Sequence, residues 1–147
     1  LHDKILGGAV SSMKTVNENI REAEVEDALI AYLDIFREVL GVDKEIHLIA
    51  RQFRLVEGKR RLDVLLAVGD EIFLIELKTE SFLKDYIEQI LAYKEEVERL
   101  QQERKLVLGK IIPVLLVTNF SDVDSKTCRE NGVRIYKYSP MFFLYFS

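Results

Sequence analysis

The chain has 147 residues, 48% of them hydrophobic and 31% charged, which suits one globular domain with a sizeable core. Its net charge of −4 excludes a globally basic nucleic-acid binder, so any DNA contact must come from a local basic patch. The single cysteine, Cys128, excludes an internal disulfide, and His2 and His47 lack a metal-binding spacing. No apolar run reaches membrane-spanning length, and "ILGGAV" is too short for a secretory signal, so we expect a cytoplasmic protein with no membrane partner.

The N-terminal residues are expected to stand apart from the domain. The chain begins with Leu1 rather than Met, which fits either a fragment or residues added for expression. The first helix signal is "TVNE", in which Thr15 and Glu18 form a capping-box pattern. We therefore expect residues 1–14 to be an extension and residues 15–147 to form a single domain.

The remaining elements follow from hydrophobic periodicity and turn signals. Apolar residues repeat at helical spacing at Val25, Leu29, Leu33 and Phe36, which predicts one helix from the capping box to about Leu40. Further along, the pattern predicts strands at 46–56, 61–68 and 71–77, a helix at 81–105, a strand at 111–119, a short helix at 122–131 and a last strand at 133–139. The order αβββαβαβ predicts an α/β fold with a mixed central sheet flanked by helices.

The second and third strands are joined by a two-residue loop. The dipeptide "GD" at 69–70 suits a type II′ turn, in which Val68 faces Glu71. The same register places Asp63 directly opposite Glu76, with Cβ atoms ~4.5–5.5 Å apart. Apolar residues occupy both sides of this hairpin, so we expect both of its faces to be covered.

Two facing carboxylates at the end of a buried hairpin require an explanation. Like charges directly opposite each other destabilise a sheet, and burial increases that cost. A divalent cation such as Mg²⁺ or Mn²⁺ would remove the conflict, because it prefers oxygen ligands. Lys78 lies two residues beyond Glu76 and therefore points to the same side of the strand. The alternative is that Asp63, Glu76 and Lys78 have no functional role and are solvated charges at strand ends.

The pattern resembles a known superfamily. An aspartate, about a dozen residues and then Glu-x-Lys, within αβββαβαβ order, is similar to the PD-(D/E)xK, or restriction-endonuclease-like, nucleases. "RLDVLLAVGDEIFLIELK" looks like the central motif of archaeal NucS-type endonucleases, although Leu62 replaces the usual proline. The resemblance implies that Asp63, Glu76 and the main-chain carbonyl of Leu77 bind Mg²⁺ or Mn²⁺. It implies that Lys78 orients or deprotonates the attacking water.

Two helical residues extend the resemblance. Many members carry a glutamate on the first helix that reaches the metal, and of Glu22, Glu24 and Glu26 only Glu26 leans toward the core side. In "QILAY", Gln89 and Tyr93 match the QxxxY motif of RecB-like exonucleases, in which the glutamine lies by the active site. Otherwise, Glu26 is an ordinary surface acid, Gln89 a surface amide and Tyr93 a core residue.

Basic residues of the first hairpin supply the local patch. These residues are Arg51, Arg54, Lys59, Arg60 and Arg61, and each is either a phosphate contact or part of a solvated charged turn. The apolar C-terminus, "MFFLYFS", is open to two interpretations: a last strand, or a contact with a second copy (a homodimer) or a further domain.

The most concrete prediction is therefore a metal-dependent DNA nuclease that hydrolyses phosphodiester bonds. The alternative is a catalytically inactive module that kept the nuclease fold and binds DNA or a protein partner. DNA cleavage with Mg²⁺, Mn²⁺ or EDTA separates the two, and a salt-sensitive DNA shift assay identifies a domain that binds no nucleic acid.

Overall fold

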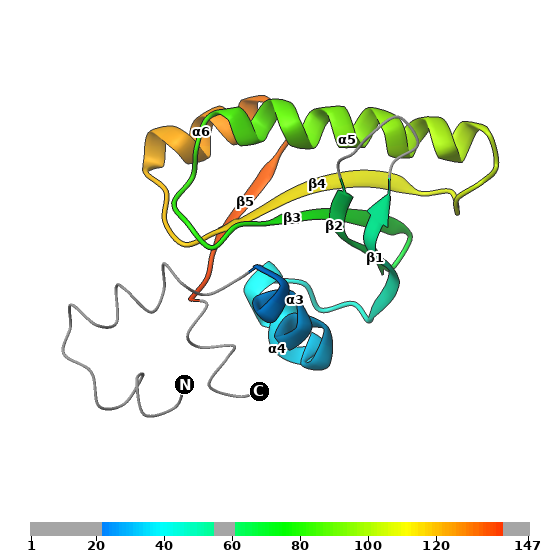
Figure 1. Ribbon diagram of the computed structural model, residues 1–147, viewed down its shortest axis with the longest axis horizontal. Helices are drawn as coiled ribbons and strands as arrows, with labels where there is room; N and C mark the ends of the chain where they lie inside the picture. Colours follow the sequence, from blue (N-terminus) through cyan, green and yellow to red (C-terminus); the bar gives the residue numbers. More distant parts are fainter. Residues whose placement is uncertain (1–21, 55–60, 140–147) are drawn as a thin grey trace.

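The computed structural model describes residues 22–54 and 61–139, apart from the side chains of Ile35, residues 52–54 and residues 61–63. The predicted capping box at Thr15, the turn with Lys59 and Arg60, and the apolar C-terminus lie outside the described residues. The elements, labelled as in Figure 1, are α3 (Glu22–Ala31), α4 (Leu33–Leu40), β1 (Ile46–Arg54), β2 (Arg61–Val68), β3 (Glu71–Leu77), α5 (Asp85–Gln102), β4 (Lys110–Val117), α6 (Asp122–Glu130) and β5 (Arg134–Lys137).

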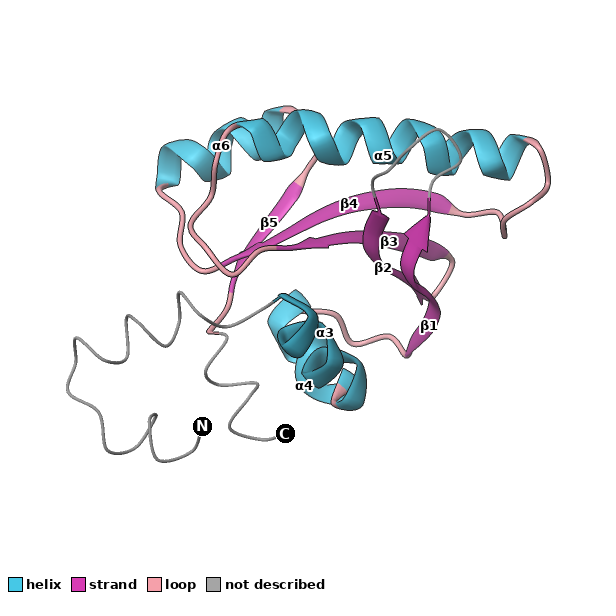
Figure 2. Cartoon of the chain, in the orientation of Figure 1, coloured by secondary structure: helices cyan, strands magenta, loops and turns pink. Residues whose placement is uncertain are grey.

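The strands of the described part of the chain form one five-stranded mixed sheet in the order β1-β2-β3-β4-β5. The pairs β1–β2 and β2–β3 are antiparallel, whereas β3–β4 and β4–β5 are parallel. Helices α3 and α4 lie on one side of the sheet, and α5 and α6 lie on the other (Figure 2). The predicted α/β architecture is therefore confirmed, and the order of elements is as predicted except that two helices replace the single first helix.

Each face of the sheet carries its own hydrophobic core. Val64, Leu66 and Ile75 pack toward α3 and α4, together with Phe36. On the opposite face, Leu65, Leu74 and Leu115 pack against α5, which contributes Tyr86, Ile90, Tyr93 and Val97. Because successive side chains of a strand point to opposite faces, a strand buried on both sides must be apolar almost throughout. Strand β3 meets this requirement except at Glu71 and Glu76.

The first predicted helix is broken at Tyr32. That residue has φ −127° and ψ 61°, which lie outside the helical region, and α4 begins at the next residue. Leu29 and Phe36 are both buried, and their separation of seven residues keeps them on one face across the break. Hydrophobic spacing therefore predicts a single helix where the chain forms two.

The helix predicted from Ser81 begins later, at Asp85. The intervening segment continues to pair with the chain that follows β4: the Thr118 amide donates to the Glu80 carbonyl at 3.0 Å, and the Phe82 amide donates to the Asn119 carbonyl at 2.9 Å. These bonds hold residues 80–82 against the chain that follows β4, so the connection from strand to helix is longer than the sequence pattern indicates.

The connection from β4 to β5 passes through α6. The first turn of this helix is capped by reciprocal hydrogen bonds between Ser121 and Asp124. Cys128 of this helix is fully buried, and that burial raises the pKa of its thiol to about 11. This environment is that of an inert core cysteine. None of the described helices is both long and apolar enough to cross a membrane.

Candidate active site

The central hairpin has the predicted register. Val68 pairs with Glu71 and Val64 pairs with Ile75. Gly69 has φ 63° and Asp70 does not have a positive φ, which is the pattern of a type II′ turn. Continued by one residue, the same register sets the backbone of Asp63, in β2, opposite Glu76. The Asp63 side chain is outside the described part of the structure.

Glu76 is a buried carboxylate, with only 3% of its surface exposed. Its neighbours Ile75 and Leu77 belong to the core under α3 and α4, so Glu76 points to the opposite face, toward α5. Lys78 lies on that same side, with its Nζ 3.9 Å from Oε2 of Glu76. The structure thus brings together the glutamate and lysine of the Glu-x-Lys pattern.

The main chain of Lys78 is held from two directions. Its amide donates to the Leu116 carbonyl at 2.9 Å, which extends the β3–β4 ladder past the end of β3. Its carbonyl accepts a hydrogen bond of 2.7 Å from the hydroxyl of Tyr138, a buried residue that follows β5. Backbone bonds on both sides of the residue fix the direction in which its side chain leaves the strand.

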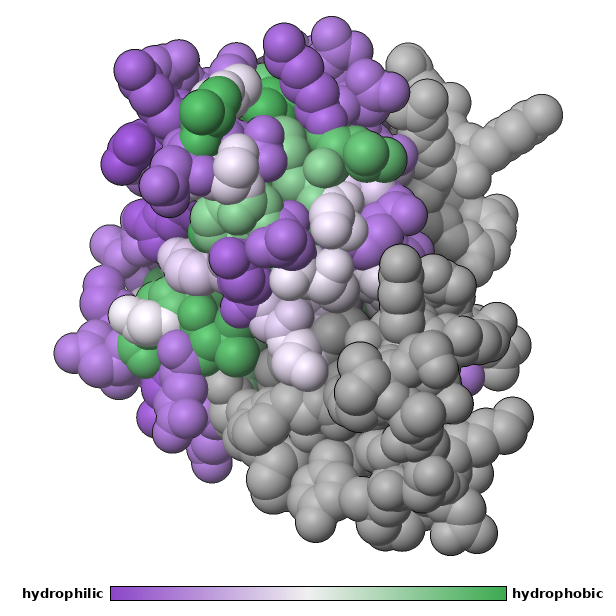
Figure 3. Space-filling view, turned by 90° about the vertical axis from the view of Figure 1, so that its left-hand side faces the viewer, coloured by the Kyte–Doolittle hydropathy of each residue, from purple (hydrophilic) through white to green (hydrophobic). Residues whose placement is uncertain are grey.

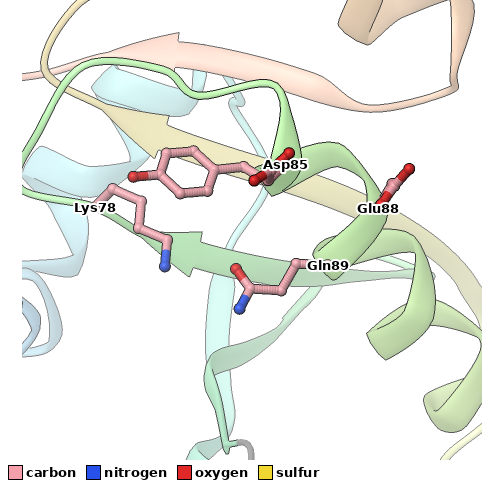
Figure 4. Close-up of a pocket in the computed structure, with 5 residues that line it drawn as sticks. Lys78, Asp85, Glu88 and Gln89 are labelled. Atoms are coloured by element: carbon pink, nitrogen blue, oxygen red, sulfur yellow. The ribbon is translucent and has the colours of Figure 1, made fainter.

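A pocket of about 600 Å³ opens where α5 begins, and it is lined by Lys78, Asp85, Tyr86, Glu88 and Gln89. Figure 4 shows the Lys78 ammonium and the Gln89 amide pointing into the same space, away from the carboxylates of Asp85 and Glu88. Gln89 therefore projects toward the strand end that carries the Glu-x-Lys pattern. A neutral amide at this position can donate or accept a hydrogen bond without adding charge.

Tyr86 also lines this pocket, and the Nζ of Lys78 lies 4.8 Å from the centre of its ring. The Tyr86 hydroxyl donates a hydrogen bond to the carboxylate of Glu80. Burial raises the pKa of Tyr86, and the bond to Glu80 and the nearby charge of Glu22 raise it further.

Glu26 and Arg51 lie together on the other face. Arg51 pairs across the strands with Val64, which belongs to the core under α3 and α4. Its Nε donates to Oε1 of Glu26 at 2.9 Å, and its guanidinium also donates to Asp27. Glu26 is 2% exposed, so the helical pattern correctly predicts its burial. The core that it faces is the one opposite to Glu76.

The remaining basic residues are placed only in part. Arg54 and Arg61 are direct partners at the end of the β1–β2 ladder, with their side chains outside the described part. Lys59 and Arg60 belong to the turn that the structure does not describe.

Figure 3 shows the end of the molecule on the left of Figure 1, where hydrophilic residues surround separate hydrophobic ones.

The buried Glu76 carboxylate is an oxygen ligand of the kind that hard cations prefer. A divalent cation would also offset the cost of burying its negative charge. Among the described side chains, no group of three or more His, Cys, Asp or Glu residues gathers closely enough to hold a metal ion. Asp63, the second predicted ligand, is not part of that set. The Glu76 carboxylate is compatible with the predicted cation.

Three contacts had no signal in the sequence. Tyr86 lies on the apolar stripe of α5 and has the spacing of a core residue, and Tyr138 is separated from Lys78 by 60 residues. The ion pair between Glu26 and Arg51 joins residues 25 apart on different elements. Only the register of β1 against β2 and the position of α3 reveal that pair.

Comparisons with solved structures identify the fold. A repair endonuclease from Pyrococcus abyssi matches with a TM-score of 0.57 and 20% identity, over 82% of this chain and 49% of that one. A complex of EndoMS with double-stranded DNA matches with a TM-score of 0.54 and 21% identity, over 79% and 45%. An XisH family protein from Nostoc punctiforme matches with a TM-score of 0.51 and 15% identity, over 82% and 94%. This chain spans about half the length of the first two proteins.

No protein-family profile matches the chain, and neither does any curated protein. The mixed five-stranded sheet with flanking helices is the restriction-endonuclease-like fold of these structural neighbours. The predicted resemblance to that superfamily is therefore confirmed at the level of the fold.

Proposed function

We propose that this protein is a metal-dependent DNA nuclease that hydrolyses phosphodiester bonds. The observation that carries the proposal is the buried Glu76 carboxylate beside the Lys78 ammonium, at the end of the β2–β3 hairpin. Asp63 would face Glu76 if the register of that hairpin continues by one residue. A surface salt bridge would not need this burial, and a purely structural strand would not need the charges. Two neighbours of the same fold are described as a repair endonuclease and as an EndoMS–DNA complex, which supports the choice of substrate.

Each residue of the proposed site has its own role. Asp63, Glu76 and the main-chain carbonyl of Leu77 would hold Mg²⁺ or Mn²⁺, which supplies Lewis acidity at a phosphate oxygen when bound. The Lys78 ammonium orients the attacking water and stabilises the negative charge that develops during attack. Gln89 donates its amide hydrogen to a phosphate oxygen or to that water.

The DNA backbone would be held by the basic end of the first hairpin. Arg54, Lys59, Arg60 and Arg61 are the proposed phosphate contacts, because their positions cluster in sequence around the turn from β1 to β2. Arg51 has a different role in this proposal, since it neutralises Glu26 and Asp27 on the other face. In this proposal Glu26 pairs with Arg51, and its expected role at the metal stays a prediction.

The test is cleavage of a panel of labelled DNA substrates: duplex, flap, junction and single strand. We expect products with Mg²⁺ or Mn²⁺ and none with EDTA. Glu76→Gln and Lys78→Met should abolish cleavage, whereas the control Glu71→Gln, at the opposite end of the same strand, should retain it. Binding of DNA with no cleavage under any metal would instead identify an inactive DNA-binding module. Equal activity of Glu76→Gln and wild type would refute the proposed site.

A further inference from the structure

The Lys78 ammonium has two neighbours of different chemistry. It lies 3.9 Å from the Glu76 carboxylate, which is longer than a hydrogen bond, and 4.8 Å from the centre of the Tyr86 ring. A lysine side chain is a flexible four-carbon stem with a compact charge, so one long ion pair does not fix its end. The aromatic face supplies a second, broad attraction for the cation.

The ring itself is held on several sides. Tyr86 is 7% exposed, and its edge meets Phe82 at a centroid distance of 6.3 Å and an interplanar angle of 83°. Its hydroxyl donates to the Glu80 carboxylate, and burial raises the pKa of that phenol, so the hydroxyl remains a neutral donor at ordinary pH. A ring fixed by packing and by a hydrogen bond is a rigid surface.

The anchor of the ring belongs to the same ladder as Lys78. The Lys78 amide bonds to the Leu116 carbonyl, and the Glu80 carbonyl accepts from the Thr118 amide at 3.0 Å. The backbones of Lys78 and Glu80 are therefore both held against the end of β4, and the Tyr86 ring is joined to Glu80 through its hydroxyl.

We propose that Tyr86 is a positioning residue, whose ring face holds the Lys78 ammonium beside Glu76 while Glu80 fixes the ring through the tyrosine hydroxyl. The effect of Tyr86 on cleavage rests on the proposed nuclease function. The contact between ring and ammonium does not depend on it. Tyr86 acts on the reaction only through Lys78, by limiting the positions that the ammonium can occupy.

The contact can be measured without any activity. In protein labelled with ¹³C-lysine, the ε-methylene signal of Lys78 is assigned by its loss in Lys78→Met. A methylene over a ring face is shielded, so this signal should lie upfield of the other lysines. Tyr86→Phe should keep the upfield shift and Tyr86→Leu should remove it. The matched control is Tyr93→Leu, which removes an equally buried ring from the same helix and should leave the Lys78 signal unchanged.

Steady-state cleavage gives the second measurement. Tyr86→Leu should lower kcat about 2- to 30-fold, the rate equivalent of one cation–π contact. KM should change little, because the ring touches the lysine and not the DNA in this proposal. Tyr86→Phe should recover most of kcat, since it keeps the ring and loses only the bond to Glu80. A purely structural tyrosine would instead show the same kcat for all three proteins after correction for the folded fraction.

The outcomes separate the two proposals. A Lys78 signal that has the same shift in wild type and in urea-unfolded protein overturns the positioning role, and this comparison decides the matter even if Tyr86→Leu does not fold. Wild-type protein that shows the upfield shift but cleaves no DNA refutes the nuclease proposal and leaves the ring–ammonium contact standing. An upfield shift with kcat equal in wild type and Tyr86→Leu overturns the link to catalysis.

Discussion

The Asp63–Glu76 pair predicts opposite effects on stability and on cleavage. Facing like charges in a sheet cost about 0.2–1 kcal/mol, so Asp63→Asn should leave the melting temperature in EDTA unchanged or raised. The same change removes a proposed metal ligand and should abolish cleavage. Thermal melts in EDTA and DNA cleavage with Mg²⁺, on one preparation, check both effects. Asp70→Asn, in the turn of the same hairpin, is the control. A large loss of melting temperature for Asp63→Asn would give the residue a structural role.

Gln89→Ala should reduce cleavage about 10- to 100-fold, the range for groups that support a metal site from outside its ligand shell. Folding should change by only ~1 kcal/mol, because the amide is half-buried and neutral. Cleavage rates and melts of the same sample provide the test. Gln102→Ala, on the far end of α5 and exposed, should match wild type in both. Wild-type rates for Gln89→Ala would make it a surface residue, and a collapsed melt would make it a structural hydrogen-bonding group.

Arg51→Ala should destabilise the fold while leaving DNA affinity nearly intact. The buried Glu26 loses a partner at 2.9 Å, which costs about 1–2 kcal/mol, since solvent reaches the half-exposed Arg51 and weakens the pair. For a domain of this size the cost is a melting-temperature loss of about 2–8 °C. Arg51→Lys keeps the charge but loses the two-pronged geometry, and should recover only part of the stability. Weaker DNA binding by Arg51→Ala with an unchanged melting temperature would instead identify Arg51 as a phosphate contact.

At the scale of elements, the end of the β1–β2 hairpin carries the next prediction. Arg54 and Arg61 are direct partners across the two strands, an arrangement that like charges disfavour unless an anion binds there. Arg54→Ala and Arg61→Ala should weaken binding about equally for all DNA sequences, and each should flatten the slope of affinity against salt by about one ion. Arg129→Ala on α6 serves as the control. Unchanged affinity and slope would mean that DNA binds another surface.

Elements whose signals are local could be predicted from the sequence. The two-residue turn at Gly69 sets the register of β2 against β3, and alternation along both strands then determines which residues share a face. The break at Tyr32 gives no such signal, because buried positions continue in phase across it. The late start of α5 depends on hydrogen bonds to Thr118 and Asn119, which belong to a strand end about forty residues away.

Some residues of the candidate site could likewise be predicted from their own segment, and others depend on the tertiary fold. Glu76 and Lys78 could be predicted because Lys78 directly follows the strand that carries Glu76, and extended backbone places residues two apart on one side. Burial of Glu26 could also be predicted from its helix, whereas the face of the sheet that α3 covers is a property of the tertiary fold. Tyr86 and Tyr138 reach Lys78 from other elements, so no pattern within their own segments distinguishes them from ordinary core residues.

At the scale of the whole molecule, β3 is the strand where the antiparallel and parallel halves of the sheet meet. The antiparallel half is built from successive hairpins, and the parallel half needs the crossovers through α5 and α6. The Glu-x-Lys segment lies on this shared strand. The full set of contacts around Lys78 therefore forms only when the antiparallel and the parallel halves of the sheet have both folded.

The hydrogen bond from the Tyr138 hydroxyl to the Lys78 carbonyl has a kinetic consequence. It closes a loop of 60 residues, whereas the β2–β3 hairpin closes across a two-residue turn. Chain entropy favours short loops first, so we expect the hairpin in the folding transition state and the tyrosine contact only after it. Tyr138→Phe should then raise the unfolding rate about 2- to 10-fold, with a nearly unchanged refolding rate. Chevron plots measure both limbs. A slower refolding limb would instead place the contact in the nucleus. On this pathway, the strand end that carries the proposed catalytic lysine is among the last parts of the chain to become rigid and among the first to loosen.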